Sequence, residues 1–114
     1  MTSQDGEIQQ ITASELKKSM DAGTAPLLLD VRESHELDIC KLPFKWHIPL
    51  GELRFHLDDL EAEKDKDIVV YCRTGKRSHM AVEFLMEAGF SKIKNLKGGV
   101  HAWSDEVDSS FRKY

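Results

Sequence analysis

Residues 68–78 read Ile68-Val69-Val70-Tyr71-Cys72-Arg73-Thr74-Gly75-Lys76-Arg77-Ser78. The first part is a short, continuous apolar run, which is typical of a strand covered on both faces of a parallel sheet. A helix is predicted from Ser78, because apolar residues then recur on one helical face until Gly89 ends the pattern. The recurring residues are Ala81, Phe84, Leu85 and Ala88. The stretch therefore predicts a strand that ends at Cys72 and turns sharply into a helix.

The apolar run over residues 27–31 predicts a second buried strand, and residues 8–11 and 93–96 are candidates for two short strands. Between and after them, four segments carry helical signals. These segments are 12–23, 34–39, 51–60 and 100–107. The first opens with a capping box from Thr12 to Glu15, and Ser34 would cap the second. Because strands and helices alternate, the sequence predicts an α/β domain with a central, mainly parallel sheet flanked by helices on both faces.

The remaining segments are predicted to connect these elements. Residues 40–49 contain Pro43 and Pro49 and should form an irregular loop, and the charged residues 61–67 should form an exposed linker. A length of 114 residues fits one compact domain over residues 1–114, with residues 1–7 as a flexible N-terminal tail.

Composition excludes several classes of function. Hydrophobic residues make up 40% and charged residues 32%, an ordinary globular balance with no apolar run long enough to cross a membrane. The polar, acidic N-terminus lacks the features of a secretory signal, so a cytoplasmic location is expected. A net charge of -4 argues against nucleic-acid binding. Two cysteines, Cys40 and Cys72, cannot form a four-cysteine zinc site, so we expect no metal and no cofactor.

Cys72 is the candidate nucleophile. Active sites of open parallel sheets form beyond the carboxyl ends of strands, where the sequence places this cysteine. Backbone N–H groups converge in a tight turn, and the following helix adds its positive N-terminal end. The turn also carries three cations and no acid: Arg73, Lys76 and Arg77. All these effects favour thiolate over thiol, whereas a strand-end cysteine without them is more often an inert core residue.

Three motifs in this chain resemble those of the rhodanese family, in particular its small single-domain members. Cys72 to Ser78 resembles the family's six-residue active loop and the start of its helix. Asp30-Val31-Arg32, followed by Glu36, resembles its first signature. Residues 98–103, Gly98-Gly99-Val100-His101-Ala102-Trp103, resemble its C-terminal signature. The motifs stand in family order.

The resemblance implies a thiosulfate sulfurtransferase-like enzyme. Cys72 would accept a sulfane sulfur from thiosulfate or a persulfide donor and pass it to cyanide, a thiol or a sulfur-carrier protein. Backbone amides of the loop would hold the persulfide, and its cations would attract the small anionic donor. The implied donor-binding residues are Arg73, Thr74, Gly75, Lys76, Arg77 and Ser78. Asp30 and Arg32 would support the site structurally, and Trp103 would pack in the core.

The sequence departs from the family between residues 40 and 50, where only His47-Ile48-Pro49 is recognisable. Phe44 and Trp46 add bulk there, either as an exposed apolar rim for a protein partner or as packing residues. Residues 103–108 also resemble rhodanese domains fused to adenylating enzymes that charge ubiquitin-like sulfur carriers. The sequence therefore does not identify the acceptor.

Three other functions compete. The first is phosphatase or arsenate-reductase chemistry on a related fold, and tyrosine phosphatases place His before the cysteine and Arg after five intervening residues. Here Tyr71 precedes Cys72, and Arg77 follows after four. A non-catalytic binding module would not need the cationic loop, and a redox pair of Cys40 with Cys72 lacks a shared motif. His79 and His101 are possible bases, but a thiolate nucleophile needs no separate base.

Overall fold

A computed structural model describes residues 8–114, so the tail predicted over residues 1–7 lies outside the described residues. Within residues 8–114 the sheet has five strands in the order β1-β5-β4-β2-β3, and every neighbouring pair is parallel. The strands are β1 (Gln9–Ile11), β2 (Leu27–Asp30), β3 (Trp46–His47), β4 (Ile68–Tyr71) and β5 (Ile93–Leu96). The predicted α/β class with a parallel sheet is confirmed.

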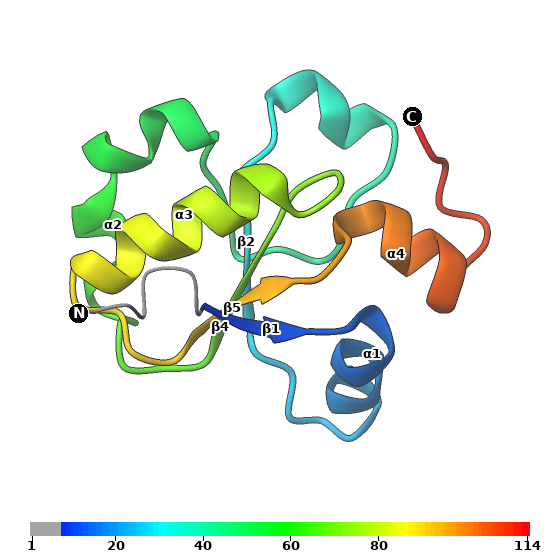
Figure 1. Cartoon of the computed structure of the whole chain (residues 1–114), viewed down its shortest axis with the longest axis horizontal. Helices are drawn as coiled ribbons and strands as arrows, with labels where there is room; N and C mark the ends of the chain where they lie inside the picture. The colour runs from blue at the N-terminus through cyan, green and yellow to red at the C-terminus, as the bar shows by residue number, and fades with distance from the viewer. Residues whose placement is uncertain (1–7) are drawn as a thin grey trace.

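Helices cover both faces of the sheet, and Figure 1 shows α1 and α3 on opposite sides of the strands. The α-helices are α1 (Ala13–Asp21), α2 (Leu57–Glu61), α3 (Lys76–Glu87) and α4 (Gly99–Glu106). Two 3₁₀ helices, η2 (Ser34–Asp38) and η3 (Leu50–Phe55), follow β2 and β3. No helix in the part of the chain from residue 8 onward is long and apolar enough to cross a membrane.

The alternation of side chains along β4 divides the core into two clusters. Ile68 and Val70 pack with Cys72 on the face that α3, α2 and η3 cover. Val69 and Tyr71 pack on the other face with residues of α1 and α4, including Trp103, which is buried as predicted. Because successive strand residues point to opposite faces, Cys72 is directed toward α3.

The predicted start of the first helix is confirmed. Thr12 Oγ1 accepts a hydrogen bond from the Glu15 N–H at 3.1 Å, and Glu15 Oε1 accepts one from the Thr12 N–H at 2.9 Å. These reciprocal bonds satisfy two N–H groups that a helix start leaves unpaired.

Three predicted segments differ from the structure. Residues 34–39, predicted as a helix capped by Ser34, form the 3₁₀ helix η2, whose N-cap is Glu33. The segment 40–49 is not wholly irregular, because Trp46 and His47 pair with Leu29 and Asp30 as β3. Residues 51–60 are not one helix but η3 followed by α2, since His56 leaves the helical conformation at φ -122 and ψ 18.

The helix after the Cys72 turn also starts earlier than predicted. It begins at Lys76 rather than Ser78, with Gly75 as its N-cap. Phe84, predicted on the buried face, is 36% exposed, whereas Ala81 and Leu85 are fully buried. The early start places Lys76 and Arg77 in the first helical turn.

Candidate active site

Residues 72–78, here called the Cys72 loop, pass from the end of β4 into α3. Gly75 makes this turn possible, because its φ of 103 lies in the left-handed region that side chains disfavour. A Cβ at this position would also lie 3.3 Å from the backbone nitrogen of Gly98. The glycine therefore lets the loop turn tightly while lying against the start of α4.

The Cys72 sulfur lies inside this turn and is surrounded by donors. The Gly75 N–H donates to Sγ at 3.1 Å, and the Ser78 N–H lies 3.4 Å from it. Ser78 Oγ is also 3.4 Å from Sγ. Cys72 is only 1% exposed, so these donors act where water screens them little. Together with the N-terminal end of α3, they stabilise negative charge on the sulfur.

Asn95 of β5 connects this sulfur site to the sheet. Its Oδ1 accepts a 2.5 Å hydrogen bond from Ser78 Oγ, and its Nδ2 donates to the Gly75 carbonyl at 3.3 Å. The side chain is buried, with 3% of the residue exposed. Asn95 therefore orients both residues that donate to Cys72 Sγ.

The start of α4 fixes the backbone of the loop from the other side. The Val100 N–H donates to the Cys72 carbonyl at 3.0 Å, and the His101 N–H donates to the Arg73 carbonyl at 3.1 Å. Gly99, at φ 60, lies directly against those two carbonyl groups, where a Cβ would collide with them. The glycine pair predicted as a signature thus serves as a close contact between α4 and the loop.

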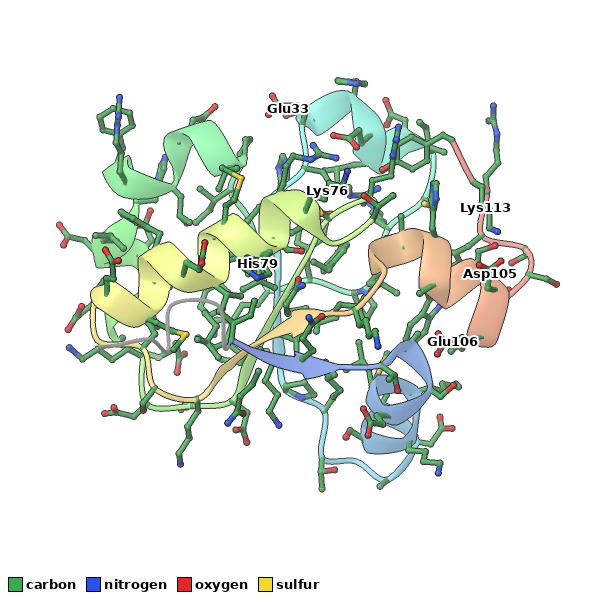
Figure 2. The ribbon with its side chains drawn as sticks, viewed as in Figure 1. Glu33, Lys76, His79, Asp105, Glu106 and Lys113 are labelled. Atoms are coloured by element: carbon green, nitrogen blue, oxygen red, sulfur yellow. The ribbon has the colours of Figure 1, made fainter. Side chains whose placement is uncertain are left out.

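The three cations of the loop have different surroundings. Arg77 donates to both carboxylate oxygens of Glu36, at 2.7 and 2.9 Å. This guanidinium lowers the pKa of Glu36 to about 2. The Arg73 guanidinium carbon lies 5.7 Å from the centre of the Tyr114 ring. Lys76 is exposed and has no carboxylate partner within residues 8–114, and Figure 2 shows it at the start of α3.

Asp30 and Arg32 form a fully buried ion pair with a 2.8 Å contact between Nη2 and Oδ2. The Arg32 guanidinium also donates to the Cys40 carbonyl at 2.8 Å and to the Tyr114 hydroxyl at 2.8 Å. Burial lowers the pKa of Arg32, but the hydrogen bonds to Asp30 and Tyr114 outweigh it and raise that pKa overall. The pair ties the end of β2 to the segment that follows η2.

An open hollow of about 450 Å³ lies beside the loop. It is lined by Gln10, Thr74, Gly75, Lys76, His79, Asn95, Lys97 and Gly98. Thr74 and Lys76 thus line the surface next to the sulfur site, while Cys72 itself does not line the hollow. Nowhere from residue 8 to residue 114 do three acidic, histidine or cysteine side chains gather as a metal site would require.

The bulky residues of the 40–50 segment pack against the body of the protein. Phe44 and Trp46 are both half-buried and join the core clusters on opposite faces of the sheet. The structure favours the packing alternative over an exposed rim. Cys40 is half-buried and free, and its sulfur lies 3.7 Å from the Arg112 carbonyl.

The sequence pointed to the residues of the loop but missed the residues that hold it. Asn95 had a weak signal at most, since it is one of two polar residues, with Lys94, in the predicted strand 93–96. Glu36 belonged to a recognised signature, but nothing in the sequence paired it with Arg77. Tyr114 carried no signal, because its position depends on the path of the chain after α4.

The chain is similar to known proteins in both sequence and fold. A family model described as a rhodanese-like domain matches residues 12–106. The maize protein "Adenylyltransferase and sulfurtransferase MOCS3-2" is 40% identical over 113 residues, which include 95% of this chain. The chain spans only 23% of that relative's length.

Other relatives match over most of their own length. A protein of Allochromatium vinosum named sulfurtransferase is 30% identical over 97 residues, which cover 85% of this chain and 89% of that protein. The crystal structure of a rhodanese-related protein from Thermoplasma volcanium has a TM-score of 0.76 and 36% identity. That match covers 87% of this chain and 93% of the other. The chain therefore belongs to the rhodanese-like sulfurtransferase family.

Proposed function

We propose that this protein is a sulfurtransferase in which Cys72 carries the sulfur. The observation that supports this most is that one buried sulfur atom accepts hydrogen bonds from the N–H groups of Gly75 and Ser78 and has the Ser78 hydroxyl within 3.4 Å. Such donors stabilise a thiolate before the reaction, and a negatively charged sulfur after it. An inert core cysteine needs none of them.

The first half-reaction takes sulfur from the donor. The Cys72 thiolate attacks the outer sulfur of thiosulfate, the S–S bond of thiosulfate breaks, and sulfite leaves with the bonding electron pair. The product is a Cys72 persulfide anion, held by the amides of the loop. Arg73 and Lys76 attract the anionic donor, and Thr74 and Lys76 line the hollow beside the loop. Arg77 acts mainly through its ion pair with Glu36, which fixes the first turn of α3.

The second half-reaction passes the outer sulfur to an acceptor. A nucleophile such as cyanide or a thiolate attacks that sulfur, the persulfide S–S bond breaks, and the Cys72 thiolate is regenerated. The names of the maize relatives join adenylyl transfer to sulfur transfer. That combination supports a sulfur-carrier protein as the acceptor. Asp30 and Arg32 support the site structurally through their buried ion pair.

Mass spectrometry after incubation with thiosulfate tests this proposal. We expect one added sulfur, about 32 Da, on Cys72, and its loss with release of thiocyanate when cyanide is added. Cys72→Ser should abolish both reactions. Cys40→Ser is the matched control, because Cys40 is the other free thiol and lies outside the loop. Thiocyanate formation by Cys72→Ser at the wild-type rate would refute the assignment.

The same preparation distinguishes the phosphatase alternative. We expect no efficient release of phosphate from an aryl phosphate, because the loop closes around a single sulfur atom and Arg77 is held by Glu36. Rapid turnover of the aryl phosphate that depends on Cys72 would favour the phosphatase instead.

A further inference from the structure

Residues 107–114, here called the return segment, lie beyond the part of the chain that the family model matches, which ends at residue 106. In Figure 1 this segment, in red, leaves α4 and turns back toward the top of the molecule. It is held along its length. The Phe111 ring lies 6.2 Å from that of Trp103, and Ser104 Oγ donates to the Phe111 carbonyl at 2.9 Å. Lys113 pairs with Asp105, and the two side chains lie close together in Figure 2.

The end of this path brings the Tyr114 hydroxyl into the ion-pair network behind the Cys72 loop. Arg32 Nη1 donates to this hydroxyl at 2.8 Å, and the hydroxyl donates to Glu36 Oε1, also at 2.8 Å. The same Glu36 oxygen accepts a 2.9 Å hydrogen bond from Arg77 Nη2. Tyr114 therefore helps to hold the carboxylate that holds Arg77.

The Tyr114 ring contacts a second cation of the loop. The Arg73 guanidinium lies over it at 5.7 Å, within the range of a cation–π interaction. The Tyr114 carbonyl lies 3.1 Å from His101 Nε2, and the His101 N–H donates to the Arg73 carbonyl. Arg73, His101 and Tyr114 thus form a closed ring of contacts. Without the aromatic ring, the exposed Arg73 side chain would lose this contact.

We propose that Tyr114 is a positioning residue of the Cys72 loop, which holds Arg73 through its ring and Arg77 through its hydroxyl and Glu36. The consequence is a fixed positive field around the Cys72 loop, suited to a small anionic donor. The choice of donor rests on the proposed function, but the field itself does not. Tyr114 touches neither Cys72 nor the donor in this role.

Alkylation of Cys72 by two reagents of similar size and different charge measures this field. Iodoacetate is an anion and iodoacetamide is neutral, and in both cases the thiolate forms an S–C bond while iodide leaves. The rate constant for iodoacetate divided by that for iodoacetamide reports the field at the sulfur. A Cys40→Ser background leaves Cys72 as the reacting thiol. Tyr114→Leu should lower the ratio about fivefold, because it removes both ring and hydroxyl.

Two further variants separate the ring of Tyr114 from its hydroxyl and provide a control. Tyr114→Phe keeps the ring over Arg73 and should lower the ratio only about twofold. Ser104→Ala is the matched control: it removes a hydrogen bond to the return segment without touching either cation, so the ratio should stay at the wild-type value. The iodoacetamide rate should change by less than about twofold in all three variants.

The outcomes separate this inference from the proposed function. An unchanged ratio in both Tyr114 variants, or an equal fall of both rate constants, would overturn the role of Tyr114 even if thiosulfate adds sulfur to Cys72. If the ratio falls as expected but thiosulfate adds no sulfur to the wild-type protein, the proposed function fails and the positioning role stands. Tyr114→Phe keeps the aromatic packing, so the ratio can be measured even if Tyr114→Leu does not fold.

Discussion

The Ser78 hydroxyl has one hydrogen and two acceptors. Asn95 Oδ1 lies 2.5 Å from Ser78 Oγ, whereas Cys72 Sγ lies 3.4 Å from it. The hydroxyl therefore donates to Asn95 in this structure, and it can rotate toward the sulfur when negative charge forms there. The Gly75 and Ser78 N–H groups remain in place in either state. The buried sulfur thus has fixed backbone donors and one adjustable donor.

Replacing Asn95 by aspartate tests this arrangement. A carboxylate still accepts the hydrogen bond from the Ser78 hydroxyl but cannot donate to the Gly75 carbonyl. It also adds a negative charge near the sulfur, which disfavours the thiolate. We expect Asn95→Asp to slow alkylation of Cys72 by iodoacetamide about tenfold at neutral pH. Stopped-flow or mass-spectrometric rates would measure the change.

Ser78→Ala provides the comparison for this variant. It removes the adjustable donor but leaves the backbone donors, so the alkylation rate should fall only about two- to threefold. Equal rates for Asn95→Asp and wild type, with both proteins folded, would show that Asn95 does not influence the sulfur.

At the scale of elements, the site depends on the contact between the Cys72 loop and the start of α4. A Cβ on Gly99 would collide with the carbonyls of Cys72 and Arg73, which accept hydrogen bonds from the first turn of α4. Gly99→Ala should therefore lower the free energy of unfolding by about 3 kcal/mol and weaken persulfide formation. Urea denaturation and the thiosulfate assay would measure both effects.

Gly51→Ala is the matched control for this substitution. No atom lies within 4 Å of a Cβ built at Gly51, so its unfolding free energy should stay within about 0.5 kcal/mol of wild type. A Gly99→Ala protein as stable as Gly51→Ala would show that α4 can move away from the loop without cost.

Across the whole molecule, the sequence predicted what local patterns determine. The apolar runs predicted β2 and β4, and β1 and β5 lie where short strands were expected. The residues of the Cys72 loop followed from the turn between β4 and α3. The short strand β3 was missed because its two residues, Trp46 and His47, carry no strand pattern and depend on pairing with β2. The contacts of Glu36 and Tyr114 were missed for the same reason, since only the folded chain brings them together.

The ionised Glu36 carboxylate, which binds Arg77 and Tyr114, contributes to the stability of the whole fold. Its pKa is about 2 in the folded protein, against an ordinary value of 4.5, chiefly because Arg77 donates to the carboxylate. A carboxylate whose pKa is lower in the folded state stabilises the fold at pH values above its unfolded-state pKa. This stability is lost as the pH falls from about 4.5 toward 2. The difference between the two pKa values corresponds to about 3 kcal/mol of unfolding free energy at neutral pH, where the carboxylate is ionised in both states.

Urea denaturation between pH 7 and pH 2 tests this coupling. Glu36→Gln should be less stable than wild type at pH 7, by about 3 kcal/mol, and the difference should shrink as the pH approaches 2. Glu87→Gln is the control, because Glu87 is exposed at the end of α3 and forms no ion pair with any residue from 8 to 114. Its stability should run parallel to wild type at every pH. A constant difference between Glu36→Gln and wild type would mean that packing, rather than the charge of Glu36, holds Arg77 and the loop.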